Sequence, residues 1–225
     1  MNQTPLHTPV LENWWAVGNP KPFDIDGFSG YECADYAFFQ HSQKINDLSQ
    51  MRGVAEQLYR RCLALTKQLG KTRLVRIWNY VPEINRGSGD NEVYRQFCWG
   101  RAEALGETVL PAATGIGSRD GVLRIGVLCT SEPKDTKAAE TALQIRHLEN
   151  PRQLSAYKYP RDYGPRSPSF ARATLIEPPA ASITAGASAE SKNQTGLLLL
   201  SGTASIVNHE TQHPHDLYKQ SEETA

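Results

Sequence analysis

The sequence predicts an α/β (α+β) fold in which two helices pack on one face of a mixed β-sheet. Residues 50–69 carry apolar side chains at the spacing of an amphipathic helix, namely Val54, Leu58, Cys62 and Leu65. Residues 74–81 alternate and are rich in β-branched and aromatic side chains, which is typical of a strand. Strand and helix patterns alternate along residues 32–129, so we expect one sheet with helices packed against it.

The elements on either side of these two show the same kinds of pattern. We expect strands at residues 32–40 and 122–129, a second helix at residues 91–105, and a glycine-rich turn at residues 111–118. Residues 1–30 lack periodicity and are rich in proline, glycine and aromatic residues, so we treat them as an N-terminal irregular segment. Trp14 and Trp15 in that segment are expected on a short strand or against the core.

The second half of the chain is less regular. Residues 131–150 are polar and charged and are expected to form a helix or an excursion. Residues 180–195 have few bulky side chains and are expected to form a mobile surface loop. The remaining expected elements are strands at residues 154–159 and 171–176, a proline-rich loop at residues 160–170, and a helix that starts at residue 216.

The stretch LLLLSGTASIVNHE, at residues 197–210, organises this half. A leucine run of this length is too short to span a membrane, which takes roughly 20 apolar residues. It predicts a strand that is buried on both faces and central or near-central in a sheet. Glu210 follows this strand, and desolvation there would raise its pKa and make it a candidate general acid. The alternatives are that Glu210 caps the following helix or is an ordinary loop carboxylate.

The composition argues against several classes of function. The 24 basic residues balance the 24 acidic ones, so neither a nucleic acid nor a membrane surface is an expected partner. The cysteines form no CxxC pair, and Pro214 separates His213 from His215 without a matching acid pair, so no metal site is expected. The N-terminus shows no secretory signal pattern, so we expect buried free thiols and a cytoplasmic location.

A weak repeat suggests how the chain is divided. CADYAFFQ leads to VAEQLYRRCLAL near the start, and LLLLSGTASIV leads to DLYKQSEETA near the end. The first copy continues with a strand, a helix and a closing strand, whereas the sequence stops where these would begin in the second copy. We therefore expect a first unit at residues 31–150 and the start of a second, truncated unit at residues 151–225. Such a truncated unit would expose apolar surface around Leu217 and the leucine strand.

Several segments of the sequence together resemble the chorismatase family. They are GRAEAL, PAATGIGS, the long block NPRQLSAYKYPRDYGPRSPSFARATL and LLLSGTASIVNHET, which lie between residues 70 and 215. The resemblance implies tandem units of the reactive-intermediate deaminase (YjgF-like) fold. It also implies that the second unit is incomplete, because family members are longer than this chain at both ends. No cofactor is implied.

The implied function is release of pyruvate from chorismate, which leaves a hydroxybenzoate or a dihydroxycyclohexadiene carboxylate. The enolpyruvyl ether would be cleaved either by protonation of its terminal methylene carbon or by elimination with transfer of a ring proton. Glu210 is the implied catalytic residue, and as a proton donor it needs a pKa raised by about two units. Family members usually have Gly-His-Glu here, whereas this chain has Asn208, at a position where glycine tolerates positive φ better.

Chorismate carries two carboxylates, and an arginine binds a carboxylate through two parallel N–H groups. Arg101 resembles the substrate-binding arginine of the family, and Arg172 lies on a strand directly after the proline-rich loop. The alternative for each arginine is a surface ion pair. The other substrate-binding candidates are Tyr159 and Tyr163 as hydrogen-bond donors, Gly115 for close approach of the backbone, and Thr203 and Ala204 beside the turn.

Two other functions stay open at this point. One is a non-catalytic truncated remnant or ligand-binding module of the deaminase-like fold. The other is an imine or enamine deaminase, which the fold alone suggests. The expected partner is the small-molecule substrate, with a monomeric state for a completed chain and self-association for a fragment.

Overall fold

The computed structural model describes residues 19–106, 109–179 and 196–224. The expectations for Trp14, Trp15 and residues 180–195 lie outside these ranges. Within them, no helix combines the length and the apolar character that a membrane span requires. In the same ranges, no group of three or more His, Cys, Asp or Glu side chains is arranged to hold a metal ion.

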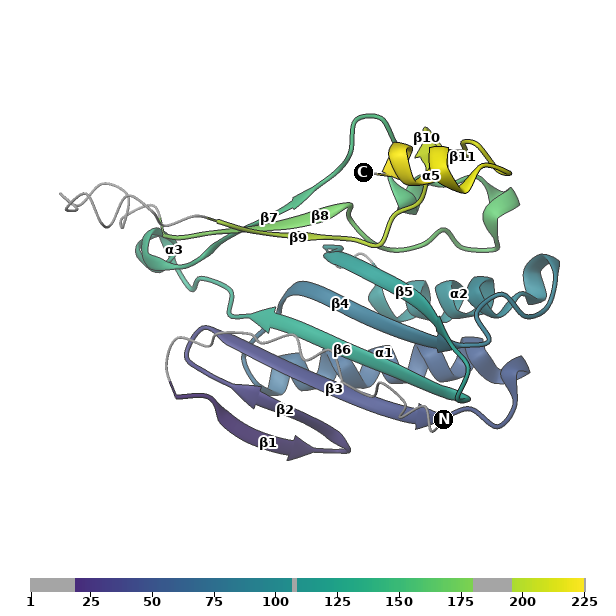
Figure 1. Ribbon diagram of the computed structural model, residues 1–225. Coiled ribbons are helices and arrows are strands. Elements are labelled where there is room, and N and C mark those ends of the chain that lie inside the picture. Colours follow the sequence, from purple (N-terminus) through teal and green to yellow (C-terminus); the bar gives the residue numbers. More distant parts are fainter. Residues whose placement is uncertain (1–18, 107–108, 180–195, 225) are drawn as a thin grey trace, which may run out of the picture.

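A six-stranded mixed sheet forms the larger part of the fold (Figure 1). Its strands are β1 (Lys21–Ile25), β2 (Phe28–Glu32), β3 (Tyr36–Lys44), β4 (Arg73–Pro82), β5 (Ala112–Ser118) and β6 (Val122–Thr130), in the order β1-β2-β3-β6-β4-β5. Only β4 and β5 run parallel; the other neighbours in this sheet are antiparallel. The hairpin β1–β2 lies where we expected an irregular segment, and β5 lies where we expected a turn. Pairing with β4 makes this glycine-rich segment a strand, against its local propensity.

Two long helices cover one face of this sheet, behind it in Figure 1. They are α1 (Met51–Gln68) and α2 (Val93–Leu105), and a short 3₁₀ helix, η1 (Leu48–Gln50), leads into α1. Their buried side chains join those of the sheet in the main core, which includes Phe39, Leu58 and Ile125. The helices touch at Gly100, where an added Cβ would lie 2.0 Å from the carbonyl oxygen of Arg52. The predicted sheet with two helices on one face is confirmed.

A second, smaller sheet lies beside the β5 edge of the first (Figure 1). Its antiparallel strands are β7 (Gln144–Leu148), β8 (Ala173–Glu177) and β9 (Leu197–Leu200), with β8 in the middle. Val75, Leu128 and Ile176 bring the two sheets together in a small core of their own. The other elements of the chain are η2 (Gly89–Asn91), α3 (Thr136–Thr141), η3 (Ala156–Lys158), η4 (Arg161–Tyr163), β10 (Ile206–Val207), β11 (Glu210–Thr211) and α5 (Leu217–Thr224).

The leucine strand is not buried on both faces, so this prediction was wrong. Among the described residues, β9 is an edge strand that pairs only with β8, and it lies at the margin of the small sheet. Leu198 is 49% exposed and Leu200 is 64% exposed, whereas Leu199 packs against the small core. An edge strand has one free side, so its apolar side chains are covered only where another layer reaches them. The prediction of exposed apolar surface around Leu217 and this strand is confirmed.

The segment 154–159, which we expected to form a strand, does not form one. It contains the 3₁₀ helix η3 instead. The amide of Leu154 donates to the carbonyl oxygen of Asn208, at 2.7 Å, and the amide of Asn208 donates to that of Arg152. These bonds pair the start of the segment with the turn after β10, and Pro160 at its end cannot donate to a ladder.

Two side-chain hydroxyls connect the sheets at β5. The amide of Ala112 donates to Oγ1 of Thr174, and the amide of Ala113 donates to Oγ of Ser201, each at 2.9 Å. The hydroxyl of Ser201 in turn donates to the carbonyl oxygen of Ala171. These bonds satisfy amides at the edge of the large sheet and fix residues 171–174 and 201 beside it. Because Arg172 lies in this segment, the connection also places that side chain.

Candidate functional site

Arg101 is a buried cation whose hydrogen-bonding capacity is largely unused. It lies on the face of α2 that turns toward the sheet and is only 3% exposed. Its Nε and Nη2 atoms are buried and have no hydrogen-bond partner among the described residues. Its guanidinium carbon lies 5.3 Å from the centre of the Tyr59 ring. A buried donor without a partner is costly, so this arrangement indicates a place for an anionic ligand.

The same face of α2 brings Tyr94 and Cys98 next to Arg101. Two effects raise the pKa of Tyr94 well above its usual value: the neighbouring thiol of Cys98, which is the larger effect, and burial. The phenol therefore stays neutral and can donate a hydrogen bond. Burial raises the pKa of Cys98 to about 11, so its thiol also stays protonated. A Cβ added to Gly115 would meet the ring of Tyr94 at 3.5 Å, which is an ordinary contact. Gly115 is therefore an exposed backbone position beside the Tyr94 ring, and its close approach to a ligand stays a prediction.

Arg172 is the second buried cation, and aromatic rings surround it. It is 9% exposed, and its guanidinium carbon lies 5.3 Å from the ring centre of Phe170 and 5.7 Å from that of Tyr159. Its Nη2 donates to the carbonyl oxygen of Leu154 and to the hydroxyl of Tyr159, whereas its Nε is buried without a partner among the described residues. Arg172 thus keeps one buried donor for a ligand and is oriented by its other bonds.

Neither arginine is the surface ion pair that was the alternative for each. In the described part of the chain, no ion pair involves Arg101 or Arg172. By contrast, Arg161 binds Asp90 through both of its terminal nitrogens, at 2.9 and 2.6 Å. Arg161 is exposed and helps to attach the proline-rich loop near the start of α2.

Tyr159 and Tyr163 connect Arg172 with the turn that carries Glu210. The two tyrosine rings lie 5.1 Å apart, centre to centre. The hydroxyl of Tyr163 donates to the carbonyl oxygen of His209, and the rings of these two residues meet edge to face at 5.7 Å. Four of the residues named from the sequence, Arg172, Tyr159, Tyr163 and Glu210, thus lie along one continuous series of contacts and neighbours.

Glu210 itself is not in the apolar pocket that we expected. It is the first residue of the two-residue strand β11, and it is exposed. Glu210 lies in the β10–β11 hairpin, whose strands are partly buried or exposed, so no apolar pocket surrounds its side chain in the described structure. Glu210 is not a helix cap either, since the side chain of Asp216 accepts from the amide of Lys219 at the start of α5.

Thr203 and Ala204 lie in the exposed turn after β9. The hydroxyl of Thr203 accepts a 3.4 Å hydrogen bond from the side-chain amide of Gln153. Just before this turn, the amide of Gly202 donates to the carbonyl oxygen of Ala113 and to the hydroxyl of Thr114 on β5. The turn is thus attached to the large sheet, but no described contact joins Thr203 or Ala204 to either buried arginine.

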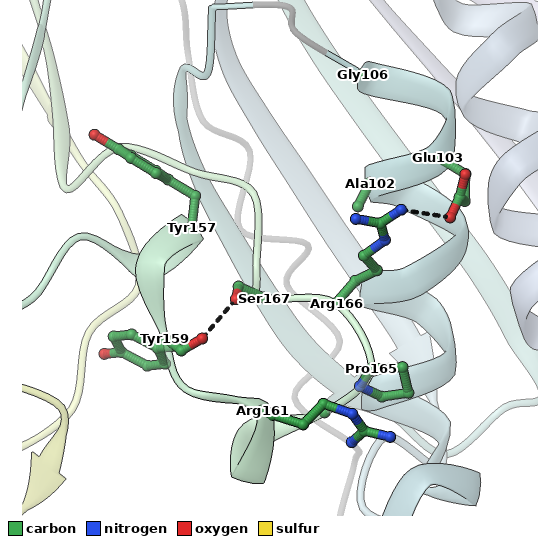
Figure 2. A pocket seen from close by; sticks show the side chains of 10 residues that line it. Ala102, Glu103, Gly106, Tyr157, Tyr159, Arg161, Pro165, Arg166 and Ser167 are labelled. Carbon is green, nitrogen blue, oxygen red and sulfur yellow. Dashed lines mark hydrogen bonds and ion pairs between the residues drawn. The ribbon is translucent and has the colours of Figure 1, made fainter.

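A cavity of about 520 Å³ opens between α2 and the proline-rich loop (Figure 2). Tyr157, Tyr159, Arg161 and Arg166 line it from the loop, and Glu103 lines it from the helix. Figure 2 shows Arg166 reaching toward Glu103, with 3.4 Å between the paired atoms. Of the residues named from the sequence as site residues, only Tyr159 lines this cavity. The opening therefore lies next to the arginine site without containing it.

Sequence reasoning missed Glu149. Desolvation raises the pKa of this carboxyl, and Ser155, Arg172 and Lys158 partly oppose that effect. Glu149 directly follows β7, in the same relation to a strand that drew attention to Glu210. The signal was present in the sequence, but residues 131–150 showed no strand pattern, so the position of this carboxyl after a strand was not recognised.

A comparison with protein families decides the class of this chain. The model of the N-terminal part of FkbO/Hyg5-like chorismatases matches residues 12–129, which is more than half of the 225 residues. The chain belongs to the FkbO/Hyg5-like chorismatase family. The resemblance seen in the sequence is confirmed, and the chorismatase family also accounts for the mixed α+β architecture.

Individual relatives support the same assignment. A chorismatase of Streptomyces hygroscopicus is 42% identical over 231 residues, and a 3-hydroxybenzoate synthase of the same organism is 35% identical over 222 residues. A crystal structure of a chorismatase superposes with a TM-score of 0.73 at 33% identity and covers 90% of this chain. The chain spans 60% and 59% of the lengths of the two sequence relatives, and 55% of the length of the solved chain.

Asn208 occupies the position where the family resemblance leads us to expect glycine. Its φ angle is +57°, in the left-handed region that favours glycine. Asn is the side chain that tolerates this region best after glycine, so the substitution retains the turn. The backbone therefore keeps a positive φ with Asn208 in this turn, and His209 and Glu210 follow it.

Proposed function

We propose that this chain belongs to an enzyme that releases pyruvate from chorismate and leaves a hydroxybenzoate or a dihydroxycyclohexadiene carboxylate. The observation that carries the proposal is the pair of buried guanidinium groups, in which Nε and Nη2 of Arg101 and Nε of Arg172 lack hydrogen-bond partners among the described residues. Chorismate has two carboxylates, and a forked guanidinium binds a carboxylate through charge-assisted hydrogen bonds. The names of the chorismatase and 3-hydroxybenzoate synthase relatives support the same substrate.

Neutral donors near the two cations would orient the rest of the substrate. Tyr159 lies against Arg172, and Tyr94 lies against Arg101, so each carboxylate would bind beside a phenol. The side chains on the sheet-facing side of α2 exclude water from Arg101, and exclusion of water strengthens an ion pair with a carboxylate. In this arrangement the enolpyruvyl ether would be held by its carboxylates rather than by a metal.

Glu210 is our proposed proton donor to the terminal methylene carbon of the ether. The contacts from Arg172 through Tyr159 and Tyr163 to His209 support its placement near the substrate. Since Glu210 is exposed in the described structure, its desolvation would have to come from bound substrate or from groups packed over β11. Protonation creates an oxocarbenium ion, water adds to it, and the hemiketal collapses to pyruvate. In a hydroxybenzoate-forming reaction, a ring proton is transferred instead and the ring becomes aromatic.

The division of the chain also belongs to this proposal. We assign residues 31–150 to a first deaminase-like unit and residues 151–225 to the start of a second. The six-stranded sheet with its two helices supports the first unit, and the strands β8 and β9 support the second. In this division β7 belongs to the first unit, because it lies before residue 150, but it pairs with β8 of the second unit. The small sheet is therefore built from strands of both units.

The described cysteines are all free thiols, and Cys62, Cys98 and Cys129 are buried. Free thiols are typical of a reducing compartment, which supports the proposal of a cytoplasmic enzyme. A small-molecule substrate is the partner that this proposal requires.

The experiment is a pyruvate-release assay with chorismate, in which pyruvate is consumed by lactate dehydrogenase and NADH is followed optically. The parent chain should release pyruvate, and Arg101→Ala should abolish most of that release. Arg60→Ala is the matched control, because Arg60 is 59% exposed on α1 and pairs with Glu56. Binding of chorismate without any pyruvate would support the non-catalytic binding module instead, and neither binding nor release would refute the proposal.

A further inference from the structure

Tyr59 is the group that faces Arg101 from the neighbouring helix. It lies in the middle of α1 and is 1% exposed. Its ring centre lies 5.3 Å from the guanidinium carbon of Arg101, which is within the range of a cation–π contact. The ring of Phe97, on α2, meets the Tyr59 ring edge to face at 6.2 Å.

Hydrogen bonds fix the far end of Tyr59 to the sheet. Its hydroxyl donates to Oδ1 of Asn79 on β4, at 2.6 Å. The amide nitrogen of Asn79 donates in turn to the carbonyl oxygen of Thr114 on β5, at 3.0 Å. Asn79 is 2% exposed and its bond from Tyr59 is buried, so these bonds help to hold the Tyr59 ring in one orientation.

Because the neighbour of Arg101 is an aromatic ring and not a carboxylate, the N–H groups of the guanidinium stay available. A carboxylate in this place would accept the N–H groups of the guanidinium and neutralise its charge. An aromatic face attracts the cation without accepting the in-plane N–H groups that a ligand carboxylate needs. Arg172 shows the contrast, because its Nη2 is already bonded to Leu154 and Tyr159.

We propose that Tyr59 is a positioning residue that holds the Arg101 guanidinium in the site while leaving its Nε and Nη2 groups available for a substrate carboxylate. This inference rests on the proposed function and deepens it, since it assigns a residue that acts on binding through Arg101. Tyr59 does not touch the substrate. Its ring sets the position of the cation, and packing against Phe97 and the bond to Asn79 both hold the ring.

The test compares substitutions that keep or remove the ring. Tyr59→Phe keeps the aromatic face and should bind chorismate with a KM within about threefold of the parent, although the lost bond to Asn79 lowers stability. Tyr59→Leu removes the face and should raise KM by about tenfold or more, which corresponds to the loss of a desolvated cation–π contact, with a smaller change in kcat. Leu65→Ala is the control for stability, because Leu65 is also buried on α1 and carries no aromatic ring. If Tyr59→Leu does not fold, Tyr59→Met removes the ring while retaining a long apolar side chain.

A second readout needs no substrate. In protein labelled with ¹⁵N-arginine, the Nε–H resonance of Arg101, identified by its absence in Arg101→Lys, senses the ring current of Tyr59. We expect this resonance to keep its position in Tyr59→Phe and in Leu65→Ala, and to move in Tyr59→Leu or Tyr59→Met. The positioning role is refuted if the resonance stays in place without the ring, or if Tyr59→Phe loses binding as fully as Tyr59→Leu. If the parent does not bind chorismate, the proposed function fails while the resonance still decides whether the ring positions Arg101.

Discussion

At the scale of single residues, Arg101 and Arg172 are both buried, keep side-chain nitrogens without a hydrogen-bond partner, and form no ion pair among the described residues. Replacing either one by alanine should weaken chorismate binding by about 2–4 kcal/mol, the range for losing one partner of a buried charge pair. Replacement by lysine should restore only part of this loss, because an ammonium group cannot bind a carboxylate in a fork. Isothermal titration calorimetry measures both effects.

The control for these variants is Arg60→Ala, which removes an exposed arginine and should leave the affinity unchanged. Binding of chorismate by both alanine variants as tightly as by the parent would show that the substrate site lies elsewhere. The cavity between α2 and the proline-rich loop would then be the next place to examine.

Glu210 carries the second residue-scale prediction. Glu210→Gln should leave fold and binding nearly intact, since the two side chains have almost the same shape. Pyruvate release should fall by at least about 10²-fold, the low end for loss of a general acid. Glu222→Gln, which changes an exposed carboxyl on α5, should leave the rate unchanged.

Glu149→Gln, measured in the same pyruvate assay, separates the two candidate acids. Desolvation already raises the pKa of Glu149, and Arg172 lies close enough to influence it. If Glu149→Gln lowers the rate and Glu210→Gln does not, the proton donor has been misassigned. Arg101, Arg172 and the two tyrosines could be named as candidates from residue type and from the family resemblance, and their role in binding stays a prediction. The sequence could not predict how much water surrounds each carboxyl, because this depends on segments that are distant in sequence.

At the scale of elements, the leucine strand shows the limit of local pattern. Four consecutive leucines suit a central strand and an edge strand equally well, and the difference is whether a second neighbour pairs with the free side. In the part of the chain that the structure describes, β8 is the one strand that pairs with β9. The glycine-rich strand β5 is the opposite case, because its residues favour a turn and its pairing with β4 makes it a strand.

The hydrogen bonds that connect the two sheets, at Ala112, Thr174 and His147, form a joint whose stability should depend on pH. Nδ1 of His147, on β7, lies 3.0 Å from the hydroxyl of Thr174, which accepts the amide of Ala112. Burial, assisted by Arg73, lowers the pKa of His147 below its usual 6.5, so the fold favours the neutral ring. As pH falls below 6.5, the unfolded chain takes up this proton first, so the free energy of unfolding should decrease until the lowered pKa is passed. Above 6.5 this contribution is complete.

Urea unfolding at several pH values between 7.5 and 5 checks this effect. The loss of stability toward acid should be smaller in His147→Asn, which retains a polar side chain but does not titrate. His213→Asn is the control, because His213 is exposed and lies outside the joint. A decrease in His147→Asn as steep as in the parent would show that other groups cause the acid sensitivity.

At the scale of the whole molecule, the first half of the chain could be predicted well and the second half only in part. The helices α1 and α2 and the strands β4 and β6 have strong periodic patterns that can be read from the sequence. The small sheet pairs β7, which comes from a polar and charged segment, with β8, and pairs β8 with β9, a leucine run without alternation. No local pattern specifies such pairings, because they depend on which strands meet in the folded chain.

The exposed apolar side chains lead to the last prediction, which concerns association. Leu197, Leu198 and Leu200 are exposed on the free-edged strand β9, and Leu217 and Tyr218 are exposed on α5. A flat apolar edge strand without a charged residue or proline is a template for pairing with another chain, so this chain should self-associate as its concentration rises. Leu198→Lys combined with Leu200→Lys places charge on the edge and should shift the population toward monomer in analytical ultracentrifugation. Gln40→Lys adds the same charge at an exposed position on β3 and should leave the association unchanged. A parent chain that sediments as a monomer at every concentration and melts cooperatively would show that the exposed leucines do not drive assembly.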